Sequence, residues 1–431
     1  MTPHTQPAST ADTSLDAPAT LIGSLVRLTL CIAVLAPLSL GAQSDMDRRV
    51  GAVFTAHEKG VEQKLAALGK SAFPALFDCL RDGQYWVEAE AGIETHSLSP
   101  DQTDWLLAAF ARLPGNELRT LLRDRITTKP TSENRRTALR LMAPIARRSD
   151  LSFCMQLAEP LTPESPVDGL ATAHLQRCLE NLLSESGSAF SSMRTVFERA
   201  HLDLRPTIIN AVTNVGTDAG LKSLSEFLSL SEELELFILS SMGRVASTAT
   251  LPVNEIILAR VRHLERSDDS RRVREALLLL GRFKDADSVP RLIDRLSDDD
   301  SAIRSAAHWS LKHLSGLELR DDPRRWEMWH KTEADWWKVH APEVLGWLRS
   351  FDVLDRKRAV AIIAQRRLRK HTLALELLPL LSDSDESVVK QTLRALSILD
   401  TRSAAPKVQE LLDHHSQAVR ESAEAVLSAW L

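Results

Sequence analysis

The chain has 431 residues, of which 44% are hydrophobic and 26% are charged, and only 16 are Gly. These figures exclude a collagen, a disordered tail protein and a disulfide-rich mini-domain, and the single Tyr argues against a β-sandwich. We therefore expect a helical protein with one large core or two ordinary ones. The formal net charge of -5 favours neither general nucleic-acid binding nor an acidic solvating role, so no nucleic-acid partner is expected.

An apolar segment near the N-terminus resembles a secretory signal peptide. Arg27 precedes the apolar run Leu28–Leu40, and Gly41 and Ala42 provide small residues for cleavage before Gln43. The run is shorter than the roughly 20 residues that a membrane span needs. We expect residues 1–42 to be a signal peptide or a disordered leader and the protein to be exported, periplasmic or in the cell envelope. Membrane attachment would require an uncleaved leader, and a cytoplasmic location is the alternative.

The Cys and His residues do not predict a metal or redox centre. No two Cys have CxxC or CxC spacing, and the 13 His residues lack a second ligand set at metal spacing. We interpret Cys79, Cys154 and Cys178 as small apolar residues on helices. A disulfide between Cys154 and Cys178 stays open if the compartment is oxidising. No metal site and no cofactor are predicted.

The first half of the chain predicts divergent helical repeats over residues 50–253. Residues 51–126 are expected to be helical, with breaks at Gly83 and Pro100. Three further segments predict helices, and two intervals predict loops. The helical segments are 132–161, 203–229 and 232–246, and the loops are 160–168 and 247–253.

Four segments of the second half are similar to one another, namely 268–281, 298–311, 383–396 and 413–426. Each begins with Asp or Ser, which favour a helix N-cap, and continues with Val or Ile and a base. Arg358 falls between the second and third segments. A shorter helix opens before two of them, at Pro290 and at Pro406. The pattern predicts helix pairs of about 30 residues that bury their apolar faces only by stacking.

This pattern resembles HEAT repeats, in the short bacterial form also called HEAT-like or PBS-lyase-type repeats. The resemblance implies an all-α fold, an α-α superhelix or solenoid of HEAT-like helix pairs over residues 43–431, with clear repeats at 254–431. It also implies an Asp–Arg ladder between repeats, which we interpret as stacking register rather than a charged binding groove. The candidates are Asp268, Asp298, Asp385 and Asp413 with Arg274, Arg304, Lys390 and Arg420.

A Trp-rich insert, residues 315–341, interrupts the repeats. Asp322 and Pro323 are expected to open a helix that ends near Val339, before Pro342 opens a normal repeat helix. Four Trp residues of this helix and Glu333 lie on or beside one stripe. They either pack the insert onto the solenoid or form an exposed platform for a partner or a glycan. The four are Trp326, Trp329, Trp336 and Trp337.

A run of bases follows the insert and either meets an anionic partner or is a solvated helix face. Its members are Arg356, Lys357, Arg358, Arg366, Arg367, Arg369 and Lys370. Aromatic residues are not interleaved with these bases, which disfavours single-stranded nucleic acid as a ligand.

The first functional hypothesis is a non-enzymatic scaffold that holds a protein partner of unknown identity on an extended helical surface. No P-loop, GxGxxG, GxSxG or HExxH motif is present, so no catalytic residue is predicted. The predicted partner-binding residues are Trp326, Trp329, Trp336, Trp337, Arg366, Arg367, Arg369 and Lys370. One alternative, implied by the PBS-lyase-type resemblance, is a chromophore lyase or a lyase subunit. The other is a structural cell-envelope protein that binds glycan through the Trp-rich insert.

Overall fold

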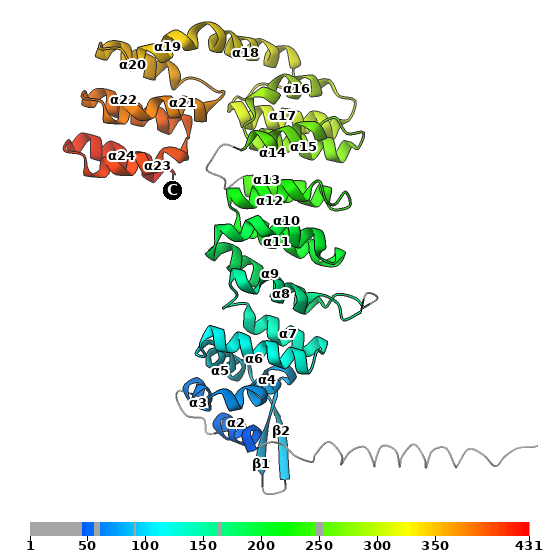
Figure 1. The fold of residues 1–431 in the computed structure, drawn as a ribbon. Coiled ribbons are helices and arrows are strands. Elements are labelled where there is room, and N and C mark those ends of the chain that lie inside the picture. Colours follow the sequence, from blue (N-terminus) through cyan, green and yellow to red (C-terminus); the bar gives the residue numbers. More distant parts are fainter. Residues whose placement is uncertain (1–44, 56–60, 90–91, 163–164, 247–252, 431) are drawn as a thin grey trace, which may run out of the picture. The chain divides into compact units, whose positions relative to one another are not determined.

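The computed structural model describes residues 45–55, 61–89, 92–162, 165–246 and 253–430, and the predicted leader lies outside them. The chain divides into two compact units, Met1–Leu121 and Leu122–Leu431. Apart from one two-stranded sheet, the regular elements of the described residues are helices, as predicted (Figure 1). None of these helices is long and apolar enough to span a bilayer.

The first unit contains a β-hairpin, packed mainly on α2, which the sequence did not predict. The strands β1 (Gln84–Ala89) and β2 (Gly92–Ser97) pair antiparallel, so residues 84–97 are not helical. The predicted breaks at Gly83 and Pro100 are confirmed as the end of α4 and the start of α5. The helices of this unit are α2 (Asp45–Thr55), α3 (Val61–Ala67), α4 (Phe73–Asp82) and α5 (Pro100–Ala111).

Close packing of α2 on β1 explains how the hairpin is held. A Cβ atom on Gly51 would lie 1.7 Å from the carbonyl oxygen of Trp86, so only Gly allows the helix to approach the strand this closely. Three residues further along α2, the buried ring of Phe54 lies 5.0 Å from the ring of Tyr85. The strands are therefore stabilised by tertiary contacts.

In the second unit, the longer helix of each pair packs on the longer helix of the next. The helices α7, α9, α11 and α13 contact one another in this order, which confirms the helices predicted within 132–161, 203–229 and 232–246 (Figure 1). The helix α6 (Gly115–Thr128) precedes them. The others are α7 (Ser132–Met142), α8 (Leu151–Ala158), α9 (Gly169–Glu185), α10 (Phe190–Arg199), α11 (Arg205–Val215), α12 (Asp218–Phe227) and α13 (Glu235–Ala246).

The C-terminal repeats continue this stacking. The helix α13 contacts α15, and α15 contacts α17; after the insert, α20, α22 and α24 contact one another in order. Such neighbour-to-neighbour stacking of helix pairs is an α-solenoid, as predicted. The helices are α14 (Glu255–Leu264), α15 (Ser270–Arg282), α16 (Val289–Asp294), α17 (Ser301–Ser315), α20 (Val353–Ile363), α21 (Lys370–Leu377), α22 (Glu386–Leu399), α23 (Ala405–Gln409) and α24 (Gln417–Trp430).

Aspartates cap the second helix of the repeats, as the sequence predicts. The side chains of Asp269, Asp300, Asp352 and Asp385 each accept a hydrogen bond from a backbone N–H in the first turn. Each cap therefore satisfies a donor that would otherwise have no partner at the helix end.

The arginines of the repeats differ from the predicted ladder. Arg304 donates to the carbonyl oxygens of Asp298 and Asp299, at 2.8 and 2.9 Å, and Arg420 donates to those of His414 and His415. These side chains therefore fasten the loop in front of their own helix.

The repeat arginine of α20 is Arg356 rather than Arg358. Its guanidinium donates to the carbonyl oxygens of Ser350 and Phe351, as Arg304 and Arg420 do in their repeats. It also forms a bidentate pair with Asp383 of the next repeat, at 2.7 and 2.9 Å. Contact between repeats is thus made by Arg356, while Arg358 approaches only Asp355 of its own helix, at 3.8 Å.

The cysteines of the described residues are buried on helices, as predicted. Cys79, Cys154 and Cys178 have free thiols in this structure. Burial raises the pKa of Cys79 to about 12. The pKa of Cys178 is also raised, mainly by a hydrogen bond with Cys154 and to a smaller extent by burial. Thiols held protonated in this way are poor nucleophiles and poor metal ligands.

Candidate functional site

The insert helix, α18 (Pro323–Asp335), begins as predicted but does not end near Val339. The carboxylate of Asp322 accepts from the backbone N–H of Arg324 at 3.1 Å, and Pro323 lies in the first turn. At the other end, residues Trp336–His340 form one π-helical turn, η7, that runs directly into α19 (Ala341–Trp347). Because Pro342 has no N–H to donate to a preceding carbonyl, a wider turn replaces the expected break.

The insert helix and the π-helical turn that continues it carry Trp side chains into two separate hydrophobic cores. Trp326 is completely buried in the α15–α17 core, which also contains Leu368, and its Nε1 donates to the carbonyl oxygen of Arg320 at 2.8 Å. Trp336 is 6% exposed and belongs to the α19–α24 core. This helical segment therefore joins the two halves of the C-terminal solenoid.

The four Trp residues do not form one exposed platform. Trp329 is half-buried and lies edge-on to Trp326, with ring centroids 5.6 Å apart. Trp337 lies edge-on to Trp336 in the same way, at 5.2 Å, and is also half-buried. Trp326 and Trp336 therefore pack the insert onto the solenoid. Only the rings of Trp329 and Trp337 are partly exposed to solvent.

Two of the predicted partner-binding arginines are held by internal contacts. The guanidinium of Arg366 lies 4.9 Å from the ring centroid of Trp336 and 3.6 Å from the buried carboxylate of Glu333. The guanidinium of Arg369 lies 5.4 Å from the ring of Trp337 and donates to Asp287 at 2.9 Å. These contacts hold the turn between α20 and α21 against neighbouring elements. Arg366 and Arg369 therefore do not belong to a freely solvated helix face.

The backbone of that turn is strained. Arg369 has φ 52°, a left-handed conformation that costs a non-Gly residue roughly 1–2 kcal/mol. The neighbouring side chain of Leu368 is 5% exposed, because it inserts into the α15–α17 core. Packing and the ion pair to Asp287 together hold the turn in a conformation that its sequence does not favour.

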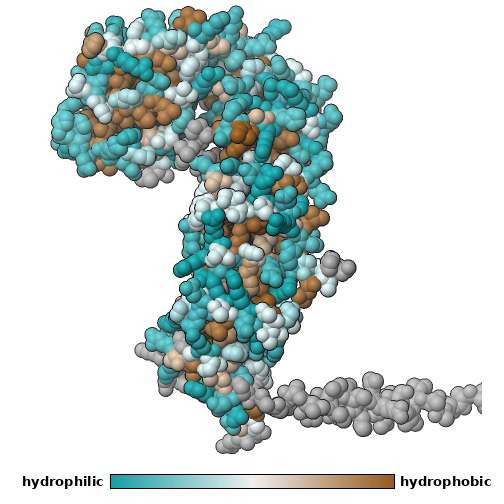
Figure 2. All heavy atoms as spheres, viewed as in Figure 1, coloured by the Kyte–Doolittle hydropathy of each residue, from teal (hydrophilic) through white to brown (hydrophobic). Residues whose placement is uncertain are grey.

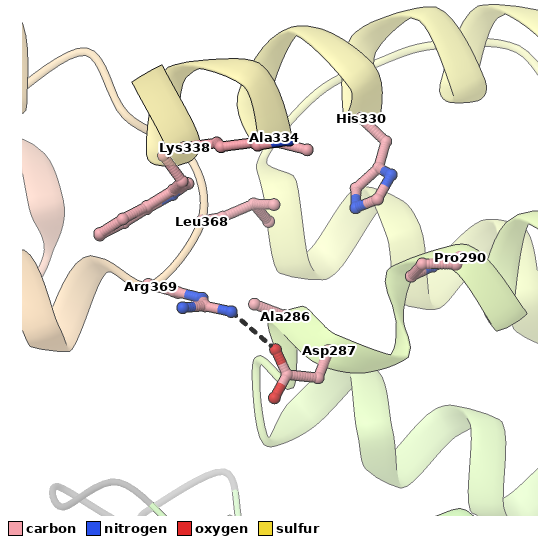
Figure 3. A pocket seen from close by; sticks show the side chains of 9 residues that line it. Ala286, Asp287, Pro290, His330, Ala334, Lys338, Leu368 and Arg369 are labelled. Atoms are coloured by element: carbon pink, nitrogen blue, oxygen red, sulfur yellow. Dashed lines mark hydrogen bonds and ion pairs between the residues drawn. The ribbon is translucent and has the colours of Figure 1, made fainter. Parts of the chain in front are cut away.

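A pocket of about 430 Å³ lies where the insert helix, the turn and α16 meet. Leu368 and Arg369 come from the turn, and the ion pair between Arg369 and Asp287 lies at its edge (Figure 3). The lining combines small apolar, aromatic and charged side chains. These are Ala286, Asp287, Pro290, His330, Ala334, Trp337, Lys338, Leu368 and Arg369.

The charges beside the pocket are partly compensated within the protein. Asp287, in the short helix η5 (Ala286–Ser288), lies 3.6 Å from Arg262 as well as pairing with Arg369. Arg262 itself forms a bidentate pair with the buried Asp285, which raises the pKa of the guanidinium further. Burial lowers the pKa of His330, so this imidazole is neutral near pH 7.

The two remaining predicted bases do not line the pocket. Arg367 lies in the turn between α20 and α21, and Lys370 is the first residue of α21. Asp287, His330 and Lys338 could not be predicted as pocket residues, because the lining comes from three segments that no local motif connects. Within the described ranges, no group of three or more His, Cys, Asp or Glu side chains could hold a metal ion.

Exposed apolar side chains are scattered over the second unit. Phe351 is fully exposed in the turn before α20, and Met328 on the insert helix is 72% exposed. Figure 2 shows such apolar residues interspersed among hydrophilic ones on the face in view. Single exposed apolar residues are common on protein surfaces, so none of them marks a site by itself.

Two segments of the C-terminal half match a known family of helical repeats. The family described as HEAT repeats matches residues 257–324 and 341–428. These two segments are HEAT repeats. Residues 325–340, between the two matches, lie within the Trp-rich insert. Comparison with curated proteins found no match.

Several solved structures are similar to this chain at low identity. An engineered protein is 15% identical, with a TM-score of 0.30, and the match covers 90% of this chain and 99% of that chain. Human deoxyhypusine hydroxylase in complex with glycerol is 14% identical, with a TM-score of 0.25 and coverage of 66% and 96%. Kap121p bound to Ste12p is 14% identical, with a TM-score of 0.40; the match covers 90% of this chain and 46% of Kap121p.

Proposed function

We propose that this protein is a non-enzymatic scaffold that binds a partner protein and that the partner places a side chain in the pocket beside the insert helix. The observation that carries the proposal is the pocket itself, built by a HEAT-repeat solenoid where its regular stacking is interrupted. A volume of about 430 Å³ is within the range of ligand-binding pockets and is large enough for an aromatic or long aliphatic side chain.

The lining supports a protein ligand. Trp and Arg are enriched at the centres of protein interfaces, and here Trp337 and Arg369 lie together at the pocket. The small side chains of Ala334 and Pro290 also line the pocket. The buried side chain of Leu368 holds one wall of the pocket in place, which limits the conformational entropy lost there when a partner binds.

Filling the pocket is expected to abolish partner capture. Ala334 is exposed and lines the pocket, so Ala334→Trp should occupy the space while leaving the buried contacts intact. In quantitative pull-downs from envelope extract with the full chain, we expect recovery of the partner to fall at least about tenfold.

The matched control is Ala361→Trp, the same substitution at an exposed position on α20 that does not line the pocket. This variant should recover the partner as well as the unmodified chain does. Equal recovery with Ala334→Trp would contradict the proposed pocket, and equal loss with both variants would show that the surface as a whole, rather than the pocket, is required.

We also propose that the protein is exported, on the strength of Arg27 and the apolar run that follows it. N-terminal sequencing of the protein from its native cell should find a chain that begins at Gln43 in the envelope fraction. A cytosolic chain that retains residues 1–42 would exclude export and would favour the cytoplasmic chromophore-lyase alternative. Glycan binding by the insert has less support, because Trp326 and Trp336 are buried.

A further inference from the structure

Basic side chains gather where the ends of α15 and α17 meet the turn between α20 and α21. We call this group, together with one exposed Trp, the basic junction. Its members are Arg282, Lys284, Trp309, His313, Arg367 and Lys370. None of them lines the pocket described above.

Trp309 provides an aromatic surface within the basic junction. Its ring is stacked on that of His313, with centroids 4.7 Å apart and planes 10° apart, and the guanidinium of Arg282 lies 5.4 Å from its centroid. Trp309 is nevertheless 38% exposed, whereas most large side chains of α17 face the core. The ring is therefore both oriented by its neighbours and accessible to a partner.

Leu368 brings the bases of the turn to this place. Because its side chain is buried in the α15–α17 core, the adjacent Arg367 must lie at the edge of that core. The Nη1 atom of Arg367 lies 3.9 Å from where a Cβ atom of Gly316 would be, at the C-terminal end of α17. Arg367 and Gly316, which are about 50 positions apart in the sequence, thus meet through tertiary packing.

The charges of these residues act on one another. The pKa of Lys370 is lowered by burial and then by the charges of Lys284 and Arg367, while Asp400 acts in the opposite direction. Burial, Lys284 and Arg282 likewise lower the pKa of His313. Lys284 thus lies within electrostatic reach of both sides of the junction.

Nearby ion pairs leave this concentration of positive charge in place. Glu318 pairs with Lys312, Asp287 pairs with Arg369 and Asp400 pairs with Arg402, so each of these carboxylates has a base of its own. Repulsion between positive charges held close together by packing raises the free energy of the folded protein. A ligand that places carboxylates among these charges would relieve this repulsion.

We propose that the basic junction binds an acidic segment of the partner protein, with Asp or Glu carboxylates on its bases and an apolar side chain against Trp309. The inference rests on the proposed function, because it takes the ligand to be a protein. One feature favours a short acidic segment over a nucleic acid. The junction offers a single exposed aromatic ring, that of Trp309, rather than the series of stacking surfaces that a single-stranded nucleic acid uses.

A direct binding measurement tests the proposal. The probe is a fluorescein-labelled peptide of Glu residues with one Phe, and its anisotropy is followed as the full chain is added at about 0.15 M ionic strength. We expect saturable binding that the double variant Lys284→Gln/Arg367→Gln weakens by at least about tenfold.

The control variant removes the same charges elsewhere. Lys331→Gln/Arg358→Gln neutralises one Lys and one Arg at exposed positions outside the basic junction, and it should weaken binding less than about twofold. Circular dichroism must show the same melting temperature for both variants. The proposal is overturned if the unmodified chain does not bind the peptide, or if both variants weaken binding equally.

Two further arms separate the possible outcomes. A single-stranded oligonucleotide of the same charge that binds as tightly as the peptide, and is lost in the junction variant, would overturn the choice of an acidic protein segment. The Ala334→Trp variant should still bind the peptide. If Ala334→Trp loses partner capture but the unmodified chain does not bind the peptide, the pocket is upheld and the junction is rejected. If Ala334→Trp keeps partner capture and the unmodified chain binds the peptide, the junction is upheld and the pocket is rejected.

Discussion

Replacing Trp326 by Ala is expected to lower the free energy of unfolding of the C-terminal repeats by about 3–5 kcal/mol. The side chain is the largest completely buried one in the described residues, and it fills the α15–α17 core together with Leu368. Its removal leaves a cavity and takes away the donor to the carbonyl oxygen of Arg320. Urea denaturation followed by far-ultraviolet circular dichroism measures the change.

Met328→Ala is the control for this experiment, because Met328 lies on the same helix and is 72% exposed. It should change the free energy of unfolding by about 0.5 kcal/mol or less. Similar free energies of unfolding for the two variants would contradict the structural role of Trp326 in the α15–α17 core.

Gly281→Ala is expected to destabilise the protein by about 1–3 kcal/mol through overpacking. A Cβ atom on Gly281 would lie 2.7 Å from the Cα, Cβ and Oγ atoms of Ser310, so α15 and α17 would have to separate. The hydroxyl of Ser310 donates to the carbonyl oxygen of Leu277 at 2.8 Å, and this bond between the helices would be strained as well.

Gly346→Ala shows what the same change does without a clash, since no atom beyond the adjacent residues and the backbone of its own helix lies within 4 Å of the added Cβ. In α19 the higher helix propensity of Ala should stabilise the protein by up to about 1 kcal/mol. Thermal unfolding of the two variants should therefore shift in opposite directions, and a rise in melting temperature for Gly281→Ala would contradict the close approach of the helices.

The repeats could be predicted from the sequence because their signal is local and recurs. Apolar residues at helical spacing and an Asp before each second helix identify both the helix and its start. The predicted ladder differs because runs of Asp offer several neighbouring caps. In the segment that begins with Asp298, the cap is Asp300, and Arg304 then reaches the loop carbonyls instead of a carboxylate.

The hairpin could not be predicted, because its sequence has a mixed local preference. Tyr85, Trp86 and Val87 favour a strand, but the Glu and Ala residues that follow favour a helix. The decision comes from packing, since Gly51 allows α2 to lie directly on β1. Tertiary contacts of this kind leave no periodic trace in the sequence.

The candidate site was predicted only in part, for the same reason. The bases that follow the insert are neighbours in sequence, yet the turn sends Arg366 to Glu333 and Arg369 to Asp287, while Arg367 lies near Gly316. Their surroundings depend on where Leu368 is buried. Sequence spacing identified the right segment but could not assign a partner to each side chain.

The insert helix also determines how the solenoid responds to local opening. In arrays of repeats, the unfolding of each repeat is coupled to that of the next through the interface between them. Here α18 carries Trp326 into one core, and the adjoining turn η7 carries Trp336 into the other, so opening of either block withdraws a large side chain from its neighbour. Backbone amides of α15–α17 and α19–α24 should accordingly exchange with solvent deuterium as one cooperative block rather than as two independent ones.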